Sequence, residues 1–353
     1  MTRKVLVVDD QGDILEAMRL LLKGNGYLAE TALSPVQALA AVEAGAHDLI
    51  MIDMNYARDT TSGAEGMALL DMLRARRPEV PVIVMTAWST IELAVEAMRR
   101  GASDFITKPW ENERVLEVIA RQSAQSNEIS LARRVQMRLL PPAHFSVPGI
   151  EGECVFHPAG ELGGDLCDVF ETGVASSAFL LGDVSGKGTG AALLMANLQA
   201  TIRGSRELAE DPVLLVNRAN RLFFQSTSPE HYATLFFGVY DAAARRLRYV
   251  NCGHPAPVLL RRDGACERLE STGLVLGAFE NALFEEKTVW VCDGDRLVLF
   301  SDGVSEAKPD EDDAWVVESV KLLGRAGSKA LAQSLAMAAP SIDDVTVLDL
   351  RFY

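Results

Sequence analysis

The most chemically suggestive stretch of this sequence is LLGDVSGKGTGAALLMANL, which runs from Leu180 to Leu198. An apolar run ends at Asp183, and three glycines and a lysine follow between Gly186 and Gly190 before a helix-like pattern begins. Such a loop could bind the phosphates of a nucleotide, or it could place Asp183 at a metal site. The two alternatives predict different enzymes.

The nucleotide alternative fails at two positions. A Walker loop has the pattern G-x-x-x-x-G-K-[ST], in which the last hydroxyl binds Mg²⁺. Here only three residues separate Gly182 from Gly186, and Gly188 follows Lys187 where serine or threonine is required. We therefore favour the metal alternative.

Four separated segments of the second half each place an aspartate beside a glycine or at a predicted strand end: ELGGDLCDVF, LLGDVSGKG, LVLFSDGVSEA and SIDDVTVLDL. Glycine lets the backbone approach an ion closely, and carboxylate and carbonyl oxygens suit Mg²⁺ or Mn²⁺ rather than zinc. Two such ions about 3.5–4 Å apart could hold a hydroxide and clamp a phosphate for in-line attack. The candidate acids are Asp165, Asp168, Asp183, Asp302, Asp343 and Asp344.

Other assignments of these and neighbouring residues compete with a metal site. Strand-end acids also form turns, an alternative that is reasonable for Asp168 and Asp344. His254, in CGHPAP, lacks further zinc partners, and we expect a structural loop histidine. Cys167 has no neighbour that would lower its thiol pKa, so we do not expect it to be a nucleophile.

Residues 1–121 alternate short apolar runs with amphipathic helical patterns. The apolar runs are KVLVV, LAETAL, DLIMI, VPVIVMT and SDFITK, and DILEAMRLLLKGNG is one of the helical patterns between them. This alternation predicts a parallel sheet covered by helices on both faces. The ligand site of such a sheet lies at the carboxyl ends of its strands.

The residues at those strand ends form a chemically coherent set. They are Asp9 and Asp10 after the first strand, Asp53 after the third, Thr86 after the fourth and Lys108 after the fifth. Each acid alone could be a helix N-cap. Three carboxylates on one edge repel one another unless a cation such as Mg²⁺ lies between them. A lysine and a hydroxyl nearby suit a phosphoryl group.

With these residues in this order, residues 1–121 resemble the receiver domain of response regulators, a five-stranded parallel flavodoxin-like α/β fold. The resemblance implies that Asp53 accepts a phosphoryl group. It implies a receiver Mg²⁺ held by Asp9, Asp10, Asp53 and the carbonyl of Asn55. One departure is that the loop after Asp53 is several residues longer than usual.

The resemblance also assigns the remaining strand-end residues. Lys108 would pair with the phosphate, and Thr86 would be the hydroxyl that moves toward it. Phe105 stands at the aromatic switch position of the family. A sensor histidine kinase is the implied phosphodonor.

A helical connector follows the first domain. From Asn112 to Leu140 there is no glycine or proline, and Pro141 and Pro142 then end the segment. Apolar residues lie toward each end, and the centre, RQSAQSNE, is polar. We expect one long helix that pairs with its twin in a homodimer. The alternative is a monomeric helix lying on the second domain.

The acid-bearing segments, with YATLFFGVYD and YVNCGHPAPVLL, resemble the PPM family of metal-dependent serine/threonine phosphatases, in its SpoIIE/RsbU branch. The likeness runs from about Pro141 to Tyr353 and implies an α+β fold, a β-sandwich flanked by helices. Leu166 and Cys167 depart from the family, replacing an aromatic pair.

The phosphatase resemblance implies two Mg²⁺ or Mn²⁺ ions. Asp183 would bridge them with help from the Val184 carbonyl, Asp302 and Asp343 would hold the second, and Asp165 would bind directly or through water. Asp344 stands where many relatives have asparagine, so we rank Asp343 above it.

Composition limits what else the chain could do. Its 353 residues suggest two or three domains, and we place the limits at 1–121, 122–140 (the helical linker) and 141–353. A formal net charge of −15 argues against a nucleic-acid or anionic membrane partner. Five scattered cysteines and the absence of a signal-like N-terminus lead us to expect a cytoplasmic protein.

Together these features predict a response regulator whose output is a phosphoserine/phosphothreonine protein phosphatase gated by phosphorylation of Asp53. The family suggests a STAS-domain anti-anti-sigma factor as substrate, in a partner-switching pathway. The alternative is a catalytically inactive, phosphorylation-controlled binding platform of the same fold.

Overall fold

The computed structural model describes residues 2–56, 63–87, 91–228, 230–307, 314–325, 331–338 and 343–353. These divide into two compact units, Met1–Leu131 and Ala132–Tyr353. The predicted limits of a separate linker stay a prediction. Most of the long loop after Asp53 and the acidic run Pro309–Asp313 lie outside the described residues.

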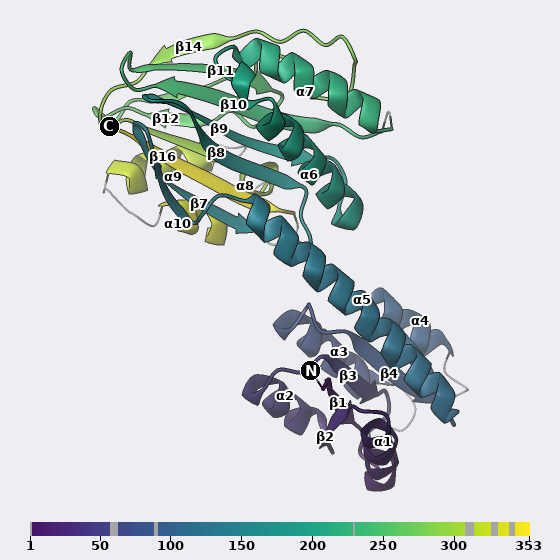
Figure 1. The fold of residues 1–353 in the computed structure, drawn as a ribbon. Helices are drawn as coiled ribbons and strands as arrows, with labels where there is room; N and C mark the ends of the chain where they lie inside the picture. Colours follow the sequence, from purple (N-terminus) through teal and green to yellow (C-terminus); the bar gives the residue numbers. More distant parts are fainter. Residues whose placement is uncertain are drawn as a thin grey trace. The chain divides into compact units, whose positions relative to one another are not determined.

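The first unit is built on a five-stranded sheet in the order β2-β1-β3-β4-β5, with parallel neighbours throughout (Figure 1). Its strands are β1 (Lys4–Val8), β2 (Leu28–Ala32), β3 (Leu49–Asp53), β4 (Val82–Ala87) and β5 (Asp104–Lys108). The predicted flavodoxin-like sheet is confirmed. All the strands run the same way, so their carboxyl ends lie at one edge.

Helices cover both faces of this sheet because successive strand residues point to opposite sides. Val5 and Val7 of β1 pack with α1 and the start of α5, whereas Leu6 and Val8 pack with α2 and α3. The helices are α1 (Gly12–Gly24), α2 (Pro35–Ala44), α3 (Ala64–Arg76), α4 (Ile91–Arg99) and α5 (Asn112–Leu139). Burial on both faces explains why the central strands β1 and β3 are nearly unbroken hydrophobic runs.

The second unit contains two antiparallel sheets, in the orders β14-β11-β10-β9-β8 and β13-β12-β15-β16-β7-β6. The first sheet comprises β8 (Asp165–Gly173), β9 (Ser176–Val184), β10 (Ala233–Asp241), β11 (Arg246–Cys252) and β14 (Lys287–Trp290). The second comprises β6 (His144–Val147), β7 (Ile150–His157), β12 (Val258–Leu260), β13 (Cys266–Arg268), β15 (Arg296–Phe300) and β16 (Val345–Phe352).

Three apolar layers hold the second unit together. One lies between the two sheets and includes the large side chains of Phe236, Tyr240 and Phe352. The outer face of each sheet packs against helices, as Figure 1 shows for α6 and α7 on the β8–β11 sheet. The helices of this unit are α6 (Gly188–Gly204), η1 (Arg206–Leu208), α7 (Pro212–Ser226), α8 (Asp302–Ser305), α9 (Ala314–Arg325) and α10 (Leu331–Ala338). The predicted sandwich flanked by helices is confirmed.

The connector is one helix, α5, which begins in the first unit and ends in the second. Its C-terminal part does not bury the predicted apolar stripe: Val135 is 53% exposed, whereas the neighbouring Gln136 is 4% exposed. Pairing of two such helices stays a prediction. Within the described residues, no helix combines the length and apolarity needed to cross a bilayer.

Candidate metal centres

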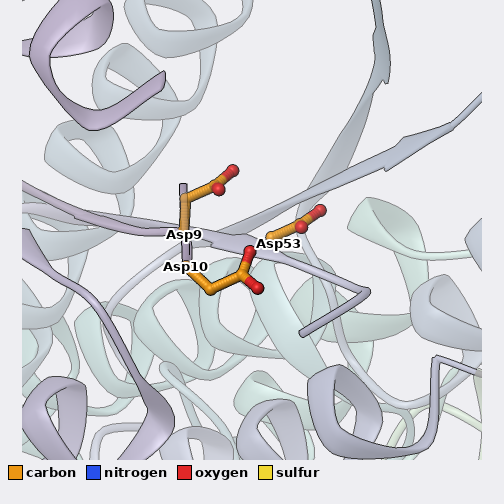
Figure 2. A group of neighbouring side chains, drawn as sticks. All are labelled: Asp9, Asp10 and Asp53. Carbon is orange, nitrogen blue, oxygen red and sulfur yellow. The ribbon is translucent and has the colours of Figure 1, made fainter. Parts of the chain in front are cut away.

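The first candidate centre lies at the carboxyl edge of the parallel sheet. Asp9 and Asp10 directly follow β1, and Asp53 is the last residue of β3, the neighbour of β1. One ligand oxygen from each of the three acids lies within 4.8 Å of the others (Figure 2). Strand adjacency brings together carboxylates that are 43 or 44 residues apart in the chain.

Lys108 provides positive charge at this cluster. Its Nζ lies 2.6 Å from Asp9 Oδ2 and 3.1 Å from Asp53 Oδ1. Burial raises the pKa of Asp53, and the charge of Asp9 adds to that rise, while Lys108 opposes it. One ammonium group cannot neutralise three carboxylates, so the site retains a negative charge that a divalent cation would balance.

The donor atoms of the cluster fit such a cation. Asp10 Oδ1 and the side-chain oxygen of Asn55 are buried and have no hydrogen-bond partner among the described residues. Buried oxygens without a partner are unfavourable unless a further ligand satisfies them. Mg²⁺ prefers oxygen ligands of this kind. For Asn55, the predicted ligand is the backbone carbonyl oxygen and not this side-chain oxygen.

The predicted switch residues lie on the neighbouring strands. Thr86 is on β4, between the strand of Asp53 and the strand of Lys108, and its side chain is fully buried. Phe105 is on β5 and is 39% exposed. Their sheet positions match the predicted roles, which remain predictions.

The second candidate centre gathers acids from both sheets of the sandwich. Asp165 at the start of β8 and Asp183 near the end of β9 are direct cross-strand partners. Asp302 begins α8, two residues after the last residue of β15, and Asp343 precedes β16, the strand that pairs with β15. The four acids therefore approach one end of the sandwich from two sheets.

Burial and repulsion between their charges shift the pKa values of these acids. Burial, followed by the charges of Asp302 and Asp343, raises the pKa of Asp183 to about 7. Burial and the charge of Asp183 also raise the pKa of Asp165 well above its usual value. Mutually repelling carboxylates in a half-buried site need cations to remain ionised together.

One further observation fits metal ions at this centre, and a lysine supplies positive charge at its edge. Asp165 Oδ2 accepts a hydrogen bond of 2.5 Å from Thr346 Oγ1, whereas its Oδ1 is buried without a partner among the described residues. At the more exposed edge, Lys187 Nζ lies 2.8 Å from Asp343 Oδ2. The carboxylate oxygens suit Mg²⁺ or Mn²⁺.

Gly164 shows how closely the backbone approaches these acids. A Cβ atom at this position would lie 2.8 Å from the carbonyl oxygen of Val184 and 3.4 Å from Asp183 Oδ1. Val184 N donates to the carbonyl of Gly164 at 3.3 Å, which joins the two loops. Only glycine fits here without displacing two predicted ligands.

For the metal-dependent phosphatase activity that the sequence predicts at this centre, we expect Gly164→Ala to reduce kcat/KM by about 10²-fold, because small displacements of reacting groups have effects of this size. The measurement is metal-dependent phosphate release at several Mn²⁺ concentrations. Gly204→Ala is the matched control, since a Cβ there meets no atom within 4 Å. Unchanged turnover in Gly164→Ala would show that the Val184 carbonyl is not needed at the site.

The carboxylates of Asp344 and Asp168 are each bound to other groups of the protein. Asp344 Oδ1 accepts from Ala159 N at 2.7 Å and Oδ2 accepts from Gly164 N at 2.5 Å, so its carboxylate holds the loop before β8. Asp168 is not a turn residue as suggested: it lies within β8, fully buried, and pairs with Arg203 of α6 at 2.5 Å.

The lesser candidates also have structural surroundings. His254 is buried beside Thr234 Oγ1, 2.9 Å from its Nδ1, and burial lowers its pKa to about 3, so the ring is neutral. Burial raises the pKa of the Cys167 thiol well above its usual value. Both observations agree with the expectation that neither residue takes part in chemistry.

Sequence reasoning missed two residues that support the second centre. Thr346 holds Asp165, and Gln136 hydrogen-bonds to the backbone of Gly163. The available signals were weak: Thr346 follows Asp344 by two residues, and Gln136 is a polar residue within an apolar stripe.

Comparison with known families identifies both halves of the chain. The family model for Stage II sporulation protein E (SpoIIE) matches residues 174–353, and the model for the response regulator receiver domain matches residues 5–120. Protein IcfG of Synechocystis is 30% identical over 211 residues, which are 51% of this chain and 33% of that protein. The transcriptional regulatory protein ZraR of Salmonella typhimurium is 36% identical over 124 residues, 35% of this chain and 27% of that protein.

Solved structures also resemble a large part of this chain. The RsbU and RsbW domains of a Mycobacterium tuberculosis protein align with a TM-score of 0.53 and 25% identity over 58% of this chain and 60% of that one. The PP2C domain of SiaA from Pseudomonas aeruginosa aligns with a TM-score of 0.55 over 66% of this chain and 99% of that one. At 18% identity, this second likeness concerns the fold alone. The matches to the curated relatives span a third or less of those proteins.

Proposed function

The chain belongs to the SpoIIE family and carries a response-regulator receiver domain, and from this premise we propose that it hydrolyses phosphoserine and phosphothreonine in a protein substrate under the control of Asp53 phosphorylation. The observation that carries the proposal is the gathering of Asp165, Asp183, Asp302 and Asp343 at one end of the sandwich, with the pKa of Asp183 raised to about 7. Such a concentration of negative charge is suited to metal-dependent phosphoryl chemistry.

The metal ligands in this proposal are those the sequence predicted. Asp183 would supply ligands to the Mg²⁺ or Mn²⁺ ions and the Val184 carbonyl would add one more, Asp302 and Asp343 would hold the second ion, and Asp165 would bind directly or through water. When bound, the ions would supply an activated water and neutralise charge on the phosphoryl oxygens.

Other residues of the chain would position these ligands. Thr346 fixes the orientation of Asp165 by its hydrogen bond to Oδ2. Asp344 holds Gly164, and so keeps the backbone of this loop against Val184. Lys187, 61% exposed at its side chain, lies where it could attract a substrate phosphate. Mobile ligands would lose the pre-organisation on which phosphoryl transfer depends.

In the receiver, a sensor histidine kinase would supply the phosphoryl group to an Asp53 carboxylate oxygen. Lys108, now paired with Asp9 and Asp53, would pair with the new phosphate, and Thr86 would move toward it. Phe105 would follow as the aromatic switch residue. A local change of charge would thus bias a two-state element.

The continuous helix α5 supports a route from the receiver to the phosphatase unit, since it begins in one and ends in the other. Exposed Leu131 and Val135 on α5 could pair with a second copy of the chain, as the predicted homodimer requires. The RsbU-domain neighbour supports a STAS-domain anti-anti-sigma factor as substrate in a partner-switching pathway.

The test is phosphate release from a phosphoserine STAS protein, with an aryl phosphate as a generic substrate, at a series of Mn²⁺ and Mg²⁺ concentrations. We expect turnover that requires metal and changes when beryllofluoride is added to mimic phosphorylated Asp53. Turnover indifferent to beryllofluoride would leave the phosphatase and refute the gating. No turnover on several phosphorylated STAS proteins would favour the binding-platform alternative.

A further inference from the structure

Gln136 occupies an unusual position on α5. Its side chain is 4% exposed, whereas those of its neighbours Val135 and Met137 are 53% and 48% exposed. The helix therefore buries a polar residue and exposes the apolar residues on either side. Burying a carboxamide is unfavourable unless its hydrogen bonds are satisfied, so the hydrogen bonds of Gln136 must offset the cost of removing its side chain from water.

Both ends of the Gln136 carboxamide bind the same residue of the phosphatase unit. Its Nε2 donates to the carbonyl of Gly163 at 2.6 Å, and its Oε1 accepts from Gly163 N at 3.2 Å. Two antiparallel hydrogen bonds to one residue restrain both its position and its orientation. A side chain with only a donor or only an acceptor could not make this pair of contacts.

Gly163 leads directly into the proposed metal centre. Gly164 and Asp165 follow it, and a Cβ at Gly163 would lie 2.7 Å from Asp344 Oδ2. Gly164 N donates to that same Oδ2, and Gly164 O accepts from Val184 N. The loop is thus held by α5, by Asp344 and by β9, and Gln136 is the contribution of α5.

We propose that Gln136 is a positioning residue of the phosphatase site, whose carboxamide sets the loop Gly163–Asp165 at the geometry that binds metal. This inference rests on the proposed metal centre. Gln136 reaches the ligands through Gly163 and is not itself a catalytic residue. Groups that orient metal ligands typically change metal affinity or activity by about 10–100-fold when removed. A movement of α5 would act on the metal loop through this contact.

The test is Mn²⁺ binding to the full-length protein by calorimetry, comparing wild type with Gln136→Met. Asp183→Asn, which retains the receiver acids, supplies the isotherm to be subtracted for the receiver site. We expect Gln136→Met to weaken Mn²⁺ binding in the phosphatase unit by about tenfold or more. The value of kcat should fall more than KM changes, because the loop and not the substrate surface is disturbed.

Gln122→Met is the matched control. Gln122 is on the same helix, is 8% exposed, and donates to the Ser103 carbonyl and to Asp104 Oδ2 in the receiver unit. Its replacement should leave Mn²⁺ affinity in the phosphatase unit unchanged. Gln136→Glu is a second variant that keeps the acceptor for Gly163 N and lacks the donor, and it too should weaken Mn²⁺ binding.

Wild-type Mn²⁺ affinity in both Gln136 variants would overturn the inference, as would equal losses in Gln136→Met and Gln122→Met. A wild-type phosphatase unit that binds no Mn²⁺ would defeat it together with the proposed function. If wild type binds Mn²⁺ without hydrolysing any phosphoprotein, the proposed function fails. A Gln136-dependent affinity would then still support the positioning role.

Discussion

Replacement of Asp183 by asparagine is expected to reduce metal-dependent phosphate release by about 10³-fold. A bound metal ion stabilises the charge of the transition state by several kcal/mol, and each loss of about 1.4 kcal/mol lowers the rate tenfold. The charges of Asp302 and Asp343 both raise the pKa of Asp183, so the three acids act on one another. The measurement is kcat/KM on a phosphoserine protein at saturating Mn²⁺. Chelation of the metal from wild type should give the same loss.

Protein stability separates this effect from misfolding. In EDTA, Asp183→Asn should melt no lower than wild type, because it removes a buried carboxylate that its neighbours repel. Added Mn²⁺ should stabilise wild type, by about 2.7 kcal/mol at a hundred times its Kd, and should stabilise the variant less. Full activity in Asp183→Asn would contradict the assignment of the metal centre.

Replacement of Asp53 by asparagine is expected to abolish the response of the phosphatase to beryllofluoride. In wild type that response should be a change in turnover of about 5- to 150-fold, the range that corresponds to typical coupling free energies between two sites. The reason is local: Asp53 and Asp9 share Lys108, and a phosphate mimic on Asp53 would draw the ammonium group away. The measurement is initial rate with and without beryllofluoride at fixed Mn²⁺.

Asp71→Asn is the control for this experiment. Asp71 lies on α3 of the same unit, forms an exposed ion pair with Arg100 and should leave the response intact. An Asp53→Asn protein that still responds to beryllofluoride would show that the mimic acts elsewhere. Basal rates equal to that of wild type in both variants would show that neither substitution disturbs the phosphatase unit itself.

The receiver site was almost fully predictable from the sequence because it depends on local patterns and one general rule. Apolar runs of five or so residues separated by helical patterns predict parallel strands, and parallel strands have their carboxyl ends at one edge. Asp9, Asp53 and Lys108 then meet without any further information. The distances of Lys108 to the two acids agree with that expectation.

The second centre was predictable only in part. Local glycine and strand-end patterns identified the acids, but they could not divide metal ligands from structural carboxylates. That division depends on what each acid meets in space: Asp344 binds the backbone of Gly164, 180 positions away, and Asp168 pairs with Arg203 of α6. Neither partner is marked in the sequence as a partner of an acid.

By itself, therefore, the sequence determined the fold class, the parallel sheet and the acids that can bind metal, because strand and turn preferences act over a few residues. Only the tertiary structure decided which acids remain available at the second centre and which polar groups hold its loop. The contact of Gln136 with Gly163 is the clearest case. It joins a helix residue to a glycine backbone, and every residue type carries the same backbone carbonyl, so such a contact leaves no signature in the identity of the residue whose backbone makes it.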